Sequence, residues 1–139
     1  MKKISYFLLF IAMVSCAPKG AEPIKLNIDG CEFCKMKIAD GKFGGELITT
    51  KGRIYKFDDI HCMINYHKEN SATNVQSFFI HDFNQNNTLI AAETAYYVKG
   101  GEINSPMRGN TIAVQTDEEA NKMAKKFKAN PISWSEIIK

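Results

Sequence analysis

The pattern of apolar and polar positions predicts several short strands in the first half of the chain. Strands are expected over 46–50, after the turn Gly44-Gly45, and over 53–57, and Lys51-Gly52 joins them, which is typical of a β-hairpin. A buried strand is expected over 75–82, where three large apolar residues follow one another. Because residues 35–38 also begin to alternate, the expected order is strand, strand, strand, helix, strand.

Two segments have the apolar spacing of amphipathic helices. One follows Asp58-Asp59, a pair from which we expect the cap, and runs to about Glu69. The other begins at Thr116, with Glu119 three residues later as a capping box, and ends before Asn130-Pro131. Their apolar faces are Ile60, Met63, Ile64 and His67 in the first helix, and Ala120, Met123, Ala124 and Phe127 in the second.

The second half of the chain repeats this plan loosely. Strands are expected over 95–99 and 111–115, the first followed by the turn Gly100-Gly101 and the second by the second helix. The pattern predicts an α+β fold of two small related strand-rich units, each with one helix. This ββαβ-like pseudo-repeat would divide the chain at about 30–84 and 85–139.

The N-terminus is typical of an exported protein. Residues 1–15 combine two lysines with an apolar run too short to span a bilayer, which indicates a signal peptide. The following Met13-Val14-Ser15-Cys16 is similar to a bacterial lipobox, so we expect Cys16 to be acylated and to anchor the protein. A plain signal peptide with an incidental cysteine is the alternative. Residues 16–29 would form the lipidated N-terminus and a flexible leader.

Composition and charge narrow the functional classes. The chain has 139 residues, 45% of them hydrophobic, which suffices for the core of one domain. Eighteen Lys and Arg against fifteen Asp and Glu give a net charge of +3. Removal of Lys2 and Lys3 with the signal peptide leaves 16 minus 15, or +1. A near-neutral chain without a basic block gives no electrostatic basis for binding nucleic acid.

The cysteines indicate the chemistry. Outside the cytoplasm thiols tend to form disulfides, yet Cys31, Cys34 and Cys62 are an odd number once Cys16 is acylated. Cys31-x-x-Cys34-x-Met36 places two thiols and a thioether together, a soft set that favours Cu(I). Structural zinc would need a second cysteine pair. A structural disulfide and a thiol-exchange pair remain open alternatives.

Three further residues are candidate copper ligands. Met107 follows a proline in a turn-forming stretch, so we expect it on a loop. Cys62 is expected to be a small buried apolar residue or a ligand, and His61 a solvated residue or an imidazole ligand. Asp58 and Asp59 read as helix caps rather than catalytic carboxylates. The remaining histidines, His67 and His81, read as packing or surface residues.

The motifs, taken in order, resemble one family. A lipobox, Cys-x-x-Cys-x-Met at 31–36, Phe-Asp-Asp-Ile-x-Cys-Met at 57–63, Ala-Tyr-Tyr-Val at 95–98 and Ser-Pro-Met-x-Gly at 105–109 are similar to the NosL family, the nitrous-oxide reductase accessory lipoproteins. The likeness covers roughly residues 30–136. Members are known as exported, membrane-anchored Cu(I) carriers built from two small related units of two strands, a helix and a strand.

The resemblance implies a role for this chain. It would be a periplasmic lipoprotein, at the outer membrane, that delivers Cu(I) for assembly of nitrous-oxide reductase by its maturation machinery, and it would not be an enzyme. The exported thiol-disulfide oxidoreductase and the disulfide-stapled binding domain are the alternatives. Carried over by motif, the ligands would include Cys31, Cys34, Met36 and Met107. The chain departs from the family's usual pattern at three places. In the cysteine motif, Glu32 and Lys35 stand in place of Pro and Gly. Arg108 is inserted before Gly109, and His61 replaces a glycine.

Overall fold

The computed structural model describes residues 20–139. The predicted signal peptide, lipobox and acylated Cys16 lie outside these residues. The elements, in chain order, are β1 (Gly45–Thr49), β2 (Ile54–Phe57), α1 (Ile60–Glu69), β3 (Val75–His81), β4 (Leu89–Ala91), the 3-10 turn η1 (Ala92–Thr94), β5 (Tyr96–Lys99), β6 (Thr111–Val114), α2 (Asp117–Phe127), β7 (Asn130–Ile132) and α3 (Trp134–Ile137).

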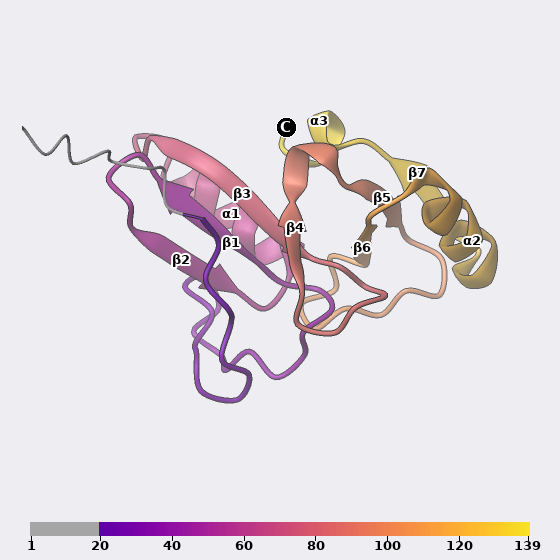
Figure 1. Cartoon of the computed structure of the whole chain (residues 1–139), viewed down its shortest axis with the longest axis horizontal. Helices are drawn as coiled ribbons and strands as arrows, with labels where there is room; N and C mark the ends of the chain where they lie inside the picture. The colour runs from indigo at the N-terminus through magenta and orange to yellow at the C-terminus, as the bar shows by residue number, and fades with distance from the viewer. Residues whose placement is uncertain (1–19) are drawn as a thin grey trace, which may run out of the picture.

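The first unit is an antiparallel sheet with one helix against it (Figure 1). Its strand order is β2-β1-β3-β4, so β1 pairs on both sides and is central. All five residues of β1 are buried, because neighbouring strands cover its edges and α1 covers one face. The predicted hairpin is present, with Leu47 opposite Tyr55.

The second unit repeats the topology of the first. Its sheet has the order β6-β5-β7, and α2 connects β6 to β7 just as α1 connects β2 to β3. Each unit therefore contains two strands, a helix and a third strand beside the first, and the predicted α+β fold of two related units is confirmed. The first sheet also has β4, after which the chain passes through η1 into the second unit.

The segment after α2 differs from the sequence pattern, although the helix itself ends before Asn130-Pro131 as expected. Helix α2 ends at Phe127, where Lys128 takes a left-handed conformation with φ 52° and terminates it. Asn130-Pro131, expected only as a stop signal, belongs to strand β7, whose position at the edge of the sheet accommodates a proline. The leader also packs earlier than predicted, because Ile24 is buried against the first unit.

The two units share a core. Phe83 donates its N–H to the Ala113 carbonyl of β6 at 2.8 Å, and Asp82 and Ala113 form a parallel bridge. Trp134 of α3 stacks on Tyr97 of the second sheet and meets Phe78 of the first sheet edge-on. These contacts hold the sheets side by side (Figure 1). Over residues 20–139, no helix has the length and hydropathy needed to cross a bilayer.

Candidate metal centre

Four side chains of the first unit meet at one place. Cys31 and Cys34 come from the loop before β1, Asp58 precedes α1, and Cys62 lies in its first turn. Their sulfur and carboxylate oxygen atoms all lie within 4.8 Å of one another. Cys31, Asp58 and Cys62 are buried, whereas Cys34 is partly exposed. All three thiols are free.

A tight turn presents the two cysteines of the loop. The N–H of Cys31 donates to the Met36 carbonyl at 2.7 Å, and the N–H of Lys35 donates to the Cys31 carbonyl at 3.0 Å. Closing the turn requires a left-handed residue, which is Lys35 with φ 64°. Lysine stands here in place of the glycine usual in the family that the sequence resembles. The turn therefore keeps its form without glycine, at a cost of about 1 kcal/mol in backbone strain.

The start of α1 presents the other two ligand groups. Asp59 is the N-cap and accepts the N–H of His61 at 2.9 Å. With Asp59 so engaged, Asp58 faces the sulfur atoms, and its two carboxylate oxygens each accept from the Cys34 thiol at 3.5 Å. Cys62 lies in the first turn of α1, and its sulfur atom is within 4.8 Å of the Asp58 carboxylate. The cap therefore decides which aspartate joins the site.

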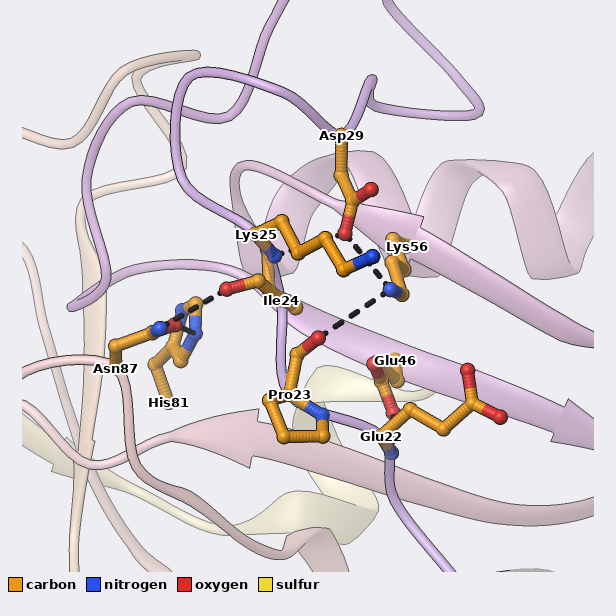
Figure 2. A network of polar contacts seen from close by, with 9 residues as sticks. All are labelled: Glu22, Pro23, Ile24, Lys25, Asp29, Glu46, Lys56, His81 and Asn87. Atoms are coloured by element: carbon orange, nitrogen blue, oxygen red, sulfur yellow. Dashed lines mark hydrogen bonds and ion pairs between the residues drawn. The ribbon is translucent and has the colours of Figure 1, made fainter.

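The segment before Cys31 is fastened to the first sheet (Figure 2). Glu22 donates its N–H to the buried Glu46 carboxylate at 2.9 Å, and the Lys56 ammonium pairs with Asp29 at 2.7 Å. Further along, Asn87 donates to the Ile24 carbonyl at 2.9 Å and accepts from the His81 ring at 3.1 Å. These contacts hold both ends of residues 22–29, so the cysteine loop starts from a fixed position.

The surroundings of the three thiols lower the pKa of one and raise the pKa of the other two. A hydrogen bond from Cys62 lowers the pKa of Cys31 to about 6, assisted by the backbone N–H groups of Asp58 and Cys34 and opposed by burial. Burial raises the pKa of Cys34 to about 11. Donation to Cys31 raises the pKa of Cys62 as well. Of the three thiols, Cys31 is thus the one whose surroundings favour the thiolate, the form that binds a soft cation.

The structure also places the other predicted site residues. Met36 ends the cysteine turn with its side chain 60% exposed. Met107 lies on a loop, as expected, half-buried against the core, and its N–H donates to Asp59 at 2.9 Å. The Pro-Met loop of the second unit is therefore anchored at the helix end that carries Cys62. The exposed His61 ring is hydrogen-bonded to Asn65 and lies outside the group of four.

Asp58 is the site residue that sequence reasoning missed. By its position before the helix it is a second candidate cap beside Asp59. The signal was present, because a helix has one N-cap and two consecutive aspartates leave one carboxylate without that role. Burial of that carboxylate then requires a partner, which the Cys34 thiol supplies.

The fold and the cluster define a class: a small α+β domain of two related units with a thiol-rich site that could hold a metal ion. The model of the NosL family matches residues 24–139. The chain therefore belongs to the NosL family. No curated protein matches the sequence. Among solved structures, the crystal structure of the copper chaperone NosL from Shewanella denitrificans is similar in fold, with a TM-score of 0.75 and 20% identity, covering 86% of this chain and 96% of that one.

Proposed function

We propose that this protein is a Cu(I) carrier rather than an enzyme. The observation that carries the proposal is the convergence of three cysteine sulfurs within 4.8 Å of one another and of Asp58. Thiolates are soft ligands that prefer Cu(I) to hard divalent cations. Membership of the NosL family and the similarity in fold to a solved copper chaperone support the same role.

The geometry suits an ion that must be passed on. Cys31 and Cys62 are buried, but Cys34 is partly exposed, so an acceptor's ligands could reach the metal from the side of Cys34. Met36 lies two residues beyond Cys34 with an exposed thioether, which carries no charge and exchanges readily. Met107 would approach from the second unit. We include His61 among the candidate ligands, although its ring is engaged with Asn65.

Competition for Cu(I) against a chromogenic chelator tests the proposal. The reduced protein is expected to retain one Cu(I), and Cys31→Ser to weaken binding by about a hundredfold because it removes the thiol whose surroundings most favour the thiolate. The double variant Met36→Leu/Met107→Leu is expected to weaken binding by more than about tenfold. Met123→Leu is the matched control, since Met123 is buried against the second sheet in the other core cluster.

The same variants separate a carrier from a thiol oxidoreductase. An oxidoreductase would use Cys31 and Cys34 alone, so the double methionine variant would keep its disulfide-reducing activity. Failure of the wild-type protein to hold Cu(I) against the chelator would remove the proposed function. An unchanged affinity in the double methionine variant would instead overturn the assignment of Met36 and Met107. Counting free thiols in protein purified without oxygen tests the disulfide-stapled alternative.

We further propose that acylated Cys16 tethers the protein to the periplasmic side of the outer membrane, where it delivers copper for assembly of nitrous-oxide reductase. The lipobox and the short apolar run before it support this location. Cys16→Ser should move the protein from the membrane fraction to the soluble fraction. Loss of copper from the reductase in a deletion strain, restored by the wild-type gene, is the result expected for delivery; a fully loaded reductase would exclude it.

A further inference from the structure

The first described residues form a strap across the first sheet (Figure 2). This strap, residues 20–24, belongs to neither sheet, and Ile24 at its end is buried. Three polar contacts hold its backbone: the Glu22 N–H to Glu46 at 2.9 Å, the Pro23 carbonyl to Lys56 at 3.4 Å and the Ile24 carbonyl to Asn87 at 2.9 Å. In each contact the partner is a side chain, so the attachment of the strap depends on these side chains.

The turn that follows the strap is held by contacts of its own. The Asn27 N–H donates to the Ile38 carbonyl at 2.8 Å, and the Ile38 N–H donates to the Asp29 carbonyl at 3.0 Å. The Asp29 carboxylate also accepts the Lys25 N–H at 2.8 Å. Because these bonds do not involve residues 20–24, the strap can leave the sheet without separating the turn that leads to the cysteines.

A carboxyl group lies buried beneath the strap. Glu46 of β1 has no exposed surface, and one of its oxygens accepts the Glu22 N–H. Its other oxygen has no hydrogen-bond partner among residues 20–139. A carboxylate in such a place loses its hydration without full compensation, whereas removal of the strap would give both oxygens access to water. The attached strap therefore favours the neutral carboxyl, and the detached strap favours the carboxylate.

The charges that face Glu46 do not reverse this preference. Lys56 faces it from β2 but is already paired with Asp29 at 2.7 Å. Glu22 and Asp29 face it with charge of the same sign. Burial raises the pKa of Glu46 to about 7, and these two carboxylates add to the effect of burial. The Glu22 N–H and Lys56 oppose it without cancelling it.

We propose that the strap is releasable: it lies on the first sheet while Glu46 is neutral and detaches as Glu46 becomes ionised. The pairing of β1 with β2 and β3 stays intact, since the strap is not part of the sheet. His81 also supports the strap, because its ring is hydrogen-bonded to Asn87. Burial lowers the pKa of His81, so its protonation would loosen the strap only in acid. At neutral pH and above, Glu46 decides.

Detachment would lengthen the link between the domain and the membrane, a consequence that rests on the proposed acylation of Cys16. With the strap attached, six residue steps (22 minus 16) separate Cys16 from Glu22, at most about 22 Å of extended chain. With the strap detached, nine steps (25 minus 16) separate Cys16 from Lys25, at most about 32 Å. The metal centre would gain reach with its ligands unchanged.

Amide hydrogen exchange, followed by NMR in the mature, reduced, metal-free protein, tests the strap. The protection factor of the Glu22 amide, which corrects for the intrinsic effect of pH, should fall about tenfold between about pH 6 and pH 8. The Asn27 amide of the following turn should keep its protection. Glu46→Gln, whose side chain stays neutral, should abolish the fall at Glu22. Glu118→Gln, which changes an exposed carboxylate of α2, should behave as the wild type.

Three results would overturn the proposal. They are a constant protection factor at Glu22, a parallel fall in Glu46→Gln, and an equal fall at Asn27, which would show that strap and turn open together. The comparison of the two amides in the wild type needs no variant, so it decides the matter even if Glu46→Gln does not fold. Failure of the copper role would leave these results unchanged, and a Cys16 without acyl chains would remove only the gain in reach.

Discussion

Two adjacent aspartates have different roles in this molecule. Asp59 divides its carboxylate between the N–H of His61 and the N–H of Met107, both at 2.9 Å. Asp58, one residue earlier, faces the Cys34 thiol. Both side chains are buried, so each needs the partner it has. At the scale of single residues, the site therefore depends on two adjacent carboxylates with different hydrogen-bond partners.

Glu46 predicts a pH dependence of stability. Burial raises the pKa of Glu46 to about 7 from its usual 4.5, and one of its oxygens accepts from the Glu22 N–H. The folded protein thus binds this proton more tightly than the unfolded chain does. The contribution to the free energy of unfolding is fully present below about pH 4.5 and is lost as the pH rises through 7. The loss is on the order of 3 kcal/mol.

Urea unfolding of wild-type protein and Glu46→Gln, repeated from pH 5 to 8, measures this effect. The variant should be less sensitive to rising pH than the wild type. His81, whose pKa burial lowers, contributes the opposite slope in both proteins, so the difference between them isolates Glu46. Glu118→Gln, at an exposed position of α2, should leave the wild-type slope unchanged. Parallel curves for Glu46→Gln and wild type would contradict the prediction.

At the scale of elements, the loop around Met107 and the start of α1 form one assembly. A Cβ atom added at Gly109 would lie 2.5 Å from the Cβ of His61 and 2.6 Å from an Asp59 oxygen. The backbone of the loop is therefore packed directly on the first turn of the helix. Ser105 and Asn110 close the loop through reciprocal side-chain hydrogen bonds. Through this contact the second unit reaches the helix end that carries Cys62.

Comparison of Asp59→Ala with Thr116→Ala should separate two roles of Asp59. One is to stabilise the start of its helix, and the other is to hold the loop around Met107. Both variants remove an N-cap side chain, and each loses about 1 kcal/mol of helix stability. Asp59→Ala also leaves the Met107 N–H without its acceptor, which raises the total loss to about 2–3 kcal/mol. Chemical denaturation measures the free energies. Cu(I) affinity should fall in Asp59→Ala alone; an equal effect of both variants would argue against the role of the loop.

At the scale of the whole molecule, α3 joins the two units. Trp134 is the one tryptophan of the chain, and its ring centroid lies 5.8 Å from that of Tyr97 and 5.3 Å from that of Phe78. The first partner belongs to the second sheet and the other to the first sheet. Trp134 fluorescence therefore reports whether the units are packed together.

Trp134→Ala should destabilise the protein by about 2–3 kcal/mol, somewhat less than loss of a fully buried tryptophan, because its ring is half-buried. Urea unfolding followed by far-ultraviolet circular dichroism measures the change. Tyr96→Ala removes an aromatic residue that is 44% exposed and should cost less than about 1 kcal/mol. If Trp134→Ala were as mild as Tyr96→Ala, α3 would not be joining the units.

Much of the fold could be predicted because its signals are local. The β-hairpin over 46–57 and the helix capping box formed by Thr116 and Glu119 each depend on residues a few positions apart. Both features are present in the structure. Strands β4 and β7 were missed because three residues are too few to show a period. Their pairing with β3 and β5 depends on the packing of the whole chain.

The sequence by itself determined the types of the two long helices and of the longer strands, and the spacing of Cys31, Cys34 and Met36, since these follow from the order of neighbouring residues. The strand expected over 35–38 was wrong, because Lys37 forms only an isolated bridge with Gly30. Only the tertiary structure decided that Cys62 and Asp58 join the two loop cysteines, while the His61 ring turns towards Asn65. The turn at Lys35 and the cap at Asp59 orient these side chains, but folding brings the two segments together. Contacts between residues far apart in the chain are set by packing, which local periodicity does not record.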